Sequence, residues 1–269
     1  MRTIYFHGMP GSPDELRLFE GIDTSKWIAP NRGELPKVAS ASERFDLLAE
    51  LVRQHGREGP VRLVGFSLGA YVALETASRL PDFPLQLDLV SAAAPLDTGP
   101  FIEQMAGRAV FTLARDRPRA FAALARIQGG MAAATPGWLR NALFASARGE
   151  DLTLSREAQF RDRMAGILRH CLTHGAHNYR VELAAYVGSW SYILKQIGHP
   201  VTLWHGDCDN WAPADMAKTL ASALPNVAGC QILPGLSHYS ALRFALSSIL
   251  ETGTFAAPGH RPEMKRCDP

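Results

Sequence analysis

The sequence predicts an α/β protein in which a mostly parallel central sheet of about six strands is flanked by helices and carries an inserted helical cap. Three observations lead to this prediction. Strand-like and helix-like runs alternate at both ends of the chain, as they do in parallel sheets covered on both faces. The stretch 97–196 is rich in Ala, Arg, Leu and Met and has no convincing strand. A glycine-flanked serine, Ser67, stands between a strand-like run and a helix-like run.

The first part of the sheet comes from the N-terminal part of the chain. Apolar runs that predict strands occupy residues 3–6, 27–29, 61–66 and 85–90, the second being the weakest. Apolar residues with helical spacing occupy 42–54 and 68–80. Ser12, followed by Pro13 and then Glu15, also predicts the start of a helix, because serine caps helix N-termini and proline suits the first helical position.

The sheet resumes after the helical stretch, with strands expected at 201–204 and 230–233. Helices are expected near 101–127, 136–147, 154–174 and 180–196. The division that follows has a core at 1–96 and 197–252, a helical cap at 97–196, and a disordered tail at 253–269, where periodicity is absent.

Composition excludes several functional classes. The 28 basic and 26 acidic residues nearly balance, so nucleic acid is not an expected partner. The four cysteines have no zinc-ligand spacing and are expected to be isolated thiols, because a chain of this length does not need disulfides. No signal sequence or membrane-length apolar run is evident, which favours a cytoplasmic protein, with a homodimer as one option.

The pentapeptide Gly65-Phe-Ser-Leu-Gly69 carries the first sign of chemistry. A tight turn from strand to helix makes a serine side chain protrude, holds it in strained backbone angles and needs small neighbours on either side. The same turn directs the backbone N–H of Leu68 toward the reacting centre. Ser67 is therefore the candidate nucleophile, against the simpler interpretation of a serine at an ordinary helix start.

A serine nucleophile needs a base and a carboxylate that orients the base. Asp207 and Asp209 follow the strand at 201–204, and His238 follows the strand at 230–233. Functional side chains gather at the carboxyl ends of parallel strands, so these residues are expected to meet Ser67. The chain order Ser67, Asp209, His238 is the order described for hydrolases built on such a turn.

With these motifs the chain resembles the α/β-hydrolase superfamily, specifically its cap-bearing serine hydrolase branch, over about residues 2–250. The resemblance also rests on the His7-Gly-Met-Pro-Gly-Ser12 loop and on Gly206, three residues before Asp209. It implies that Asp209 is the acid, with Asp207 as the rival, and that Met9 donates a backbone N–H to the oxyanion together with Leu68. In this family His7 commonly supports the oxyanion loop.

The same resemblance implies an acyl-transfer enzyme without a cofactor. The expected substrate is a small or medium carboxylic ester with an apolar portion, or an amide or thioester, cleaved through an acyl-enzyme on Ser67. Two alternatives remain open: carbon–carbon bond hydrolysis or lyase chemistry on the same residues, and binding of a small ligand without turnover. No metal is expected, although His170, His174 and His177 have the spacing of one helix face.

Overall fold

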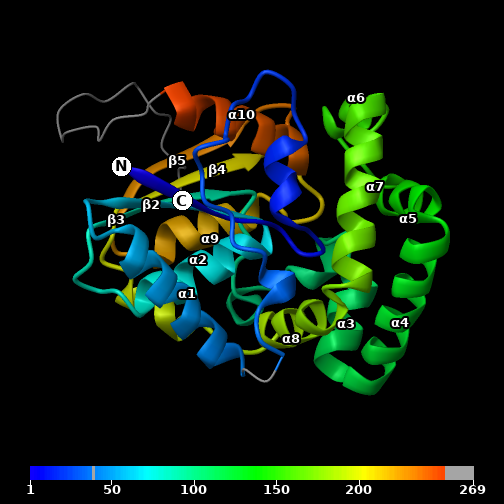
Figure 1. Cartoon of the computed structure of the whole chain (residues 1–269), viewed down its shortest axis with the longest axis horizontal. Helices are drawn as coiled ribbons and strands as arrows, with labels where there is room; N and C mark the ends of the chain where they lie inside the picture. The colour runs from blue at the N-terminus through cyan, green and yellow to red at the C-terminus, as the bar shows by residue number, and fades with distance from the viewer. Residues whose placement is uncertain (38–39, 252–269) are drawn as a thin grey trace.

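The structure, a computed structural model, describes residues 1–37 and 40–251 of the 269-residue chain. The tail expected at 253–269, which includes Cys267, lies outside the described residues. Within them, the core is a parallel sheet with helices on both faces, and further helices stand beyond one end of the strands (Figure 1). This arrangement confirms the predicted fold class.

The sheet has five strands, one fewer than expected, and all of them are parallel. In space they follow chain order: β1 (Arg2–Phe6), β2 (Val61–Phe66), β3 (Leu85–Val90), β4 (Val201–Gly206) and β5 (Val227–Leu233). The missing strand is the weak run at 27–29, where only Ile28 bridges to Ile4. The proline that follows at Pro30 has no N–H to continue a ladder, yet the bridge still covers the outer edge of β1.

Each strand sends alternate side chains to opposite faces of the sheet. Ile4 and Phe6 of β1 belong to one buried cluster, with residues of α1 (Ala41–His55), α2 (Leu68–Ser78) and α9 (Asp215–Ala223). Tyr5 belongs to a second cluster, with residues of α10 (His238–Glu251). Because all the strands are parallel, their carboxyl ends lie at the same end of the sheet.

The N-terminal helices agree with the sequence in part. The helix expected at 42–54 is α1, which begins with a capping box between Ser40 and Glu43. The helix expected after Ser12 is only a short 3₁₀ turn, Pro13–Arg17. Glu15 does not behave as a first-turn residue exposed to solvent, because its side chain is fully buried against Tyr5 and Gly8.

The chain between β3 and β4 contains six α-helices among the described residues: α3 (Arg108–Asp116), α4 (Pro118–Ala134), α5 (Pro136–Phe144), α6 (Asp151–Leu154), α7 (Ala158–Thr173) and α8 (Ala176–Tyr186). The single helix expected at 101–127 is divided at Arg117, which precedes a proline and is therefore pushed out of helical geometry. The helix expected at 180–196 begins earlier and ends at Tyr186, and a 3₁₀ segment follows.

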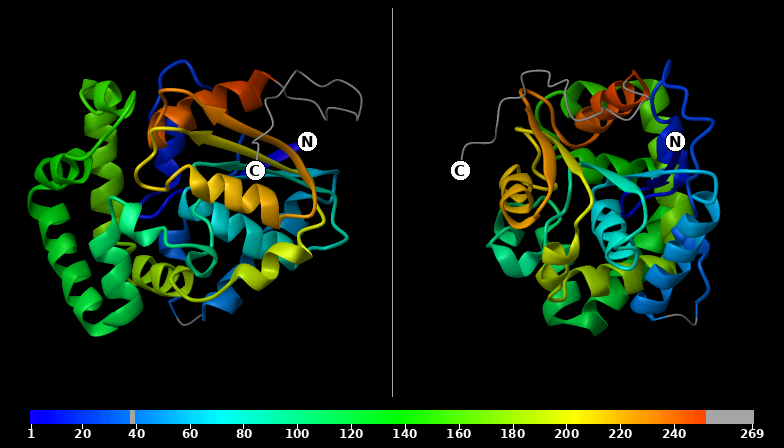
Figure 2. Two further views of the ribbon diagram at one scale, coloured as in Figure 1. Left: turned by 180° about the vertical axis from the view of Figure 1, so that it is seen from behind. Right: turned by 90° about the vertical axis from the view of Figure 1, so that its left-hand side faces the viewer.

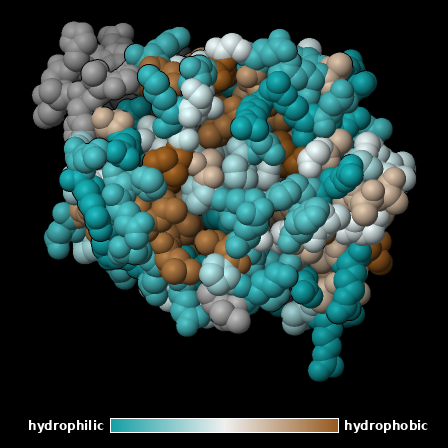
Figure 3. All heavy atoms as spheres, in the orientation of Figure 1, coloured by the Kyte–Doolittle hydropathy of each residue, from teal (hydrophilic) through white to brown (hydrophobic). Residues whose placement is uncertain are grey.

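Most of these helices lie beyond the carboxyl ends of the strands, as the left-hand view of the ribbon shows (Figure 2). The face drawn in Figure 3 is largely hydrophilic, with apolar side chains gathered in patches near its middle. No helix among the described residues is long and apolar enough to cross a bilayer.

Candidate active site

Ser67 lies in a sharp turn between β2 and α2. Its backbone angles, φ 56° and ψ −123°, are in a region that residues with a side chain rarely adopt. A Cβ atom on Gly69 would lie 2.0 Å from the backbone oxygen of Phe6, and one on Gly65 would lie 2.7 Å from Cα of Ala70. The two glycines therefore leave the room that this strained turn requires.

Asp209 and His238 form a buried hydrogen-bonded pair. Nδ1 of His238 donates to Oδ2 of Asp209 at 2.8 Å. The other carboxylate oxygen accepts the backbone N–H groups of Trp211 and Ala212, at 2.8 and 3.0 Å. Because Nδ1 carries the proton in this arrangement, Nε2 of the imidazole is left to accept one.

The pair shifts the pKa of both partners. Burial alone would lower the pKa of His238, but the charge and hydrogen bond of Asp209 outweigh burial and raise it above 6.5. Burial likewise opposes ionisation of Asp209, yet His238 and the hydrogen bonds around the carboxylate hold its pKa below the usual range. Asp209 is thus ionised and positioned to stabilise an imidazolium.

Asp207, the rival acid, lies elsewhere. Its side chain is exposed, and its carboxylate accepts the backbone N–H of Gly235 at 2.8 Å. It therefore holds the turn after β5, whereas Asp209 is the aspartate that contacts His238.

His238 is held next to the residue that precedes Ser67. Phe66, which precedes Ser67, packs against the imidazole with 4.7 Å between ring centroids. The backbone oxygen of His238 accepts the hydroxyl of Ser91, which follows β3. Asp151 accepts the backbone N–H groups of Tyr239 and Ser240 at 3.0 and 2.7 Å, so a residue of the inserted helices caps the helix that begins at His238.

The two predicted oxyanion donors, Met9 and Leu68, line the same pocket as Ser67. Leu68 is the first residue of α2, where backbone N–H groups have no partner within the helix. Met9 follows His7 and Gly8 in the loop after β1, and it is buried with its sulfur 3.5 Å from Sγ of Cys171.

Glu15 anchors this loop, a role that the sequence did not suggest. Its carboxylate accepts the N–H of Gly8 and the hydroxyl of Tyr5, each at 2.8 Å. Burial raises the pKa of Glu15 to about 7, although Gly8, Tyr5 and Arg32 oppose this rise. The pattern Ser-Pro-Asp-Glu is the same whether the glutamate serves a helix start or turns inward, so no sequence signal separates the two.

Two more buried histidines lie near these residues. His7 donates Nδ1–H to the oxygen of Gly8 at 2.7 Å, and burial with the nearby charge of Arg32 holds its pKa well below 6.5. His205 is buried and donates to the oxygen of Ala212 at 2.7 Å. Burial lowers its pKa as well, so both are neutral supports of the backbone.

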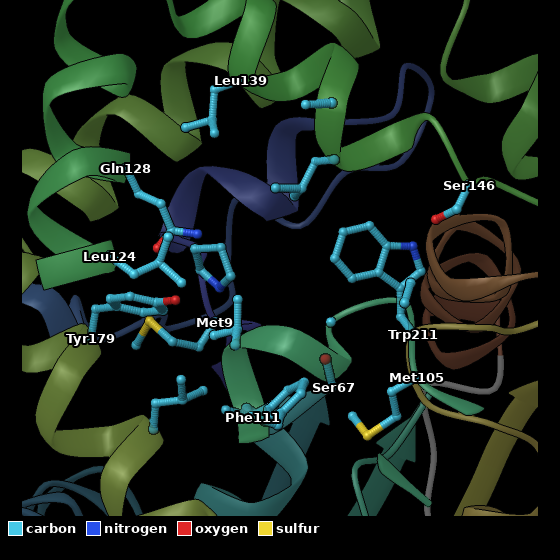
Figure 4. A pocket seen from close by; sticks show the side chains of 18 of the residues that line it. Met9, Ser67, Met105, Phe111, Leu124, Gln128, Leu139, Ser146, Tyr179 and Trp211 are labelled. Atoms are coloured by element: carbon cyan, nitrogen blue, oxygen red, sulfur yellow. The ribbon is translucent and has the colours of Figure 1, made fainter. Parts of the chain in front are cut away.

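A pocket of about 350 Å³ opens above Ser67, and we call it the acyl pocket. Figure 4 shows the hydroxyl of Ser67 pointing into it, with Trp211 beside it and Leu124 and Gln128 across the space. Its lining is mainly apolar and comes largely from the inserted helices, including Met105, Met131 and Trp138. Phe101, Phe144 and Tyr186, aromatic residues of the same segment, do not line it.

The three histidines with helical spacing do not share a helix. His170 belongs to α7, His174 ends it, and His177 belongs to α8 beyond Gly175. Nε2 of His177 donates to the backbone oxygen of Lys37 at 3.0 Å. Among residues 1–37 and 40–251, no three metal-ligating side chains come together in a metal-binding group.

Comparisons with known proteins give one family-model match. A family model described as a thioesterase domain matches residues 22–91, which include Ser67 but neither Asp209 nor His238. No match was found among curated proteins.

Solved structures resemble nearly the whole chain. A thermophilic esterase from Thermogutta terrifontis, solved with malate bound, has a TM-score of 0.67 and 18% identity, covering 93% of this chain and 88% of its own. An α/β-hydrolase enzyme from a Medee basin deep-sea metagenome has a TM-score of 0.65 and 14% identity, covering 97% and 91%. A bromoperoxidase from Bacillus anthracis has a TM-score of 0.64 and 16% identity, covering 93% and 90%. The chain therefore has the α/β-hydrolase fold.

Proposed function

We propose that the protein is a serine hydrolase that cleaves a carboxylic ester or thioester with an apolar acyl group. The observation that carries the proposal is the strained Ser67 turn at the wall of an apolar pocket, where the neighbouring Phe66 packs on a His238 that is hydrogen-bonded to Asp209. Buried acid–imidazole pairs of this kind activate serine nucleophiles in unrelated proteins.

The reaction proceeds in two halves. Nε2 of His238 takes the hydroxyl proton of Ser67 while the serine oxygen bonds to the acyl carbon, and the resulting oxyanion is stabilised by the N–H groups of Met9 and Leu68. The imidazolium then protonates the leaving alcohol or thiol. Water, deprotonated by His238, attacks the acyl-enzyme to form a second tetrahedral intermediate. Collapse of this intermediate releases the carboxylic acid, and His238 returns the proton to the oxygen of Ser67.

The pocket supports the substrate class. Its lining around Ser67 is mainly apolar, so transfer of an acyl chain from water is favourable by about 0.8 kcal/mol per methylene. Most of the residues that line the pocket belong to the segment 97–196. We propose that this segment is a cap over the core formed by 1–96 and 197–252. The family-model match favours a thioester as the second candidate, and the esterase among the similar structures favours an oxygen ester.

The proposal is tested by labelling and turnover of the intact protein. A fluorophosphonate should label the wild type and leave Ser67→Ala unlabelled. The wild type should hydrolyse p-nitrophenyl butyrate, and kcat for this ester should be about 10⁴-fold lower in Ser67→Ala. Circular dichroism checks that the variant is folded. A folded Ser67→Ala protein with near-normal turnover would reject the mechanism, and tight ligand binding without turnover in the wild type would indicate a binding protein instead.

A further inference from the structure

A second, smaller pocket lies on the other side of α5 from the acyl pocket. It has a volume of about 260 Å³, and its lining residues are Arg140, Asn141, Phe144, Ser155, Arg156 and Arg161. Leu139, Ala142 and Leu143 of the same helix line the acyl pocket, so α5 forms the wall between the two. We call the smaller one the arginine pocket.

The arginine pocket concentrates positive charge without a carboxylate in its lining. Arg140 is only 9% exposed, and none of the three arginines forms an ion pair with a residue that the structure describes. Charged side chains that are this buried are almost always paired. The pocket is therefore positively charged, and none of its lining residues supplies a negative charge. This is the charge expected of an anion-binding site.

The partners of Arg140 reinforce this point. Its Nη1 donates to the backbone oxygen of Ser155 at 3.1 Å, and its Nη2 donates to the side-chain oxygen of Asn141. Both acceptors are neutral, so they orient the guanidinium without neutralising it. Burial lowers the pKa of Arg140, the charge of Arg161 lowers it further, and the exposed Asp162 opposes the shift.

We propose that the arginine pocket binds a phosphate group, either as inorganic phosphate or as a phosphate monoester. The planar N–H forks of arginine match phosphate oxygens, and a dianion suits three converging cations better than a single carboxylate does. The three side chains come from α5, from the turn after α6 and from α7. One bound phosphate therefore joins three segments of the inserted helices, at a place separate from Ser67.

The test is calorimetric titration of the full chain with inorganic phosphate and with phenyl phosphate at about 0.15 M salt, where weak surface attraction is screened. Arg156→Gln and Arg161→Gln remove exposed arginines of the pocket. Each should weaken binding about tenfold or more, since each removes a charge-assisted contact. Arg169→Gln, an exposed arginine on α7 outside the pocket, is the matched control and should change the affinity less than twofold.

The outcomes decide between the alternatives. Saturable binding that Arg156→Gln and Arg161→Gln weaken, and Arg169→Gln does not, supports the site. Equal affinity for both ligands identifies free phosphate as the source, and tighter binding of phenyl phosphate identifies an organic monoester. Absence of saturable binding by the wild type, or equal losses in all three variants, overturns the proposal. Because the exposed arginines carry the test, it does not depend on whether Arg140→Gln folds.

Discussion

The carboxylates of Asp207 and Asp209 follow the same strand but meet different partners, and this difference gives the first prediction. Asp209→Asn should lower kcat by orders of magnitude, about 10⁴-fold, because a neutral amide cannot stabilise the imidazolium and favours the wrong tautomer of His238. Asp207→Asn should lower it less than tenfold, since that carboxylate contacts the Gly235 turn and the Cys208 thiol and not His238. Steady-state kinetics on p-nitrophenyl butyrate measures both, and the reverse ranking would transfer the role to Asp207.

The charge state of His238 predicts the acid side of the pH profile. The imidazole must be neutral to accept a proton, so kcat/KM should rise with pH through the pKa of His238. Because Asp209, Asp151 and Glu15 raise that pKa against the effect of burial, the midpoint should lie above pH 6.5. In Asp209→Asn the principal raising charge is lost, so the residual activity should have its midpoint at lower pH. An unshifted midpoint would show that another group controls the profile.

Glu15 gives a prediction about the oxyanion loop. Glu15→Ala leaves the N–H of Gly8 and the hydroxyl of Tyr5 without their buried partner, at a cost of about 1–3 kcal/mol for each in the free energy of unfolding. It should also lower kcat, toward the roughly 10²-fold that loss of one oxyanion donor causes, because Met9 is no longer held.

Tyr5→Phe is the control for this effect, since it removes the other contact of the same carboxylate and leaves the loop anchored. Denaturant unfolding and the separation of kcat from KM compare the two variants. Equal kcat losses in Glu15→Ala and Tyr5→Phe would mean that Glu15 acts on stability alone.

At this scale the sequence was informative where a motif has a single physical meaning. The glycines around Ser67 are tied to backbone geometry, so Ser67 could be proposed from its motif, whereas Asp209 was preferred to Asp207 on the family resemblance. The anchoring contact of Glu15 depends on where β1 places Tyr5 and Gly8, which are close to it only in the folded chain. Local patterns cannot contain such a contact.

The helices between β3 and β4 supply most of the apolar lining of the acyl pocket, and this lining leads to a prediction about which acyl chains the protein prefers. Across linear esters from acetate upward, kcat/KM should rise several-fold per carbon until the acyl pocket is full, as each methylene buried adds about 0.8 kcal/mol. Met105→Ala should extend this range by enlarging the pocket, and Trp138→Ala, whose side chain is 59% exposed, should have a smaller effect.

Met131→Ala completes the lining series, and Leu152→Ala, exposed on α6 and outside the pocket, is the control. A profile that is flat, or that responds equally to all four substitutions, would mean that these helices do not select the acyl group.

The limits of two central strands were predicted more accurately than those of the inserted helices, and the reason is physical. The strands β2 and β3 are rich in apolar residues and have turn residues at each end, and their predicted limits are those observed. The inserted helices pack around the acyl pocket as well as the core, so apolar residues occur on several faces and blur the period. Proline and glycine set their real limits, as at Pro118 and Gly175.

For the whole molecule, the inserted helices and the sheet share one hydrophobic core. Phe111, Tyr186 and Trp190 belong to the same buried cluster as the strands and α1. A buried ion pair also joins the two parts, because Arg32 donates twice to the carboxylate of Glu182 on α8, at 3.0 and 2.7 Å.

These links predict that residues 97–196 unfold together with the sheet. Calorimetry should give one transition, and far-UV circular dichroism should coincide with tryptophan fluorescence. Glu182→Ala should destabilise the whole molecule by about 3–5 kcal/mol, since it leaves Arg32 buried and unpaired. Two separated transitions, or a loss confined to one of them, would show that the inserted helices are independent.

The cap that Asp151 provides for α10 also has a consequence for how the chain acquires activity. His238 is in place only after β5, the end of β3 and the inserted helices have all come together, and these contacts span most of the chain. Pairings between residues so distant in sequence form late in folding. During refolding from denaturant, recovery of turnover should therefore lag behind recovery of the helical circular dichroism signal. An incompletely folded chain would then have no active Ser67.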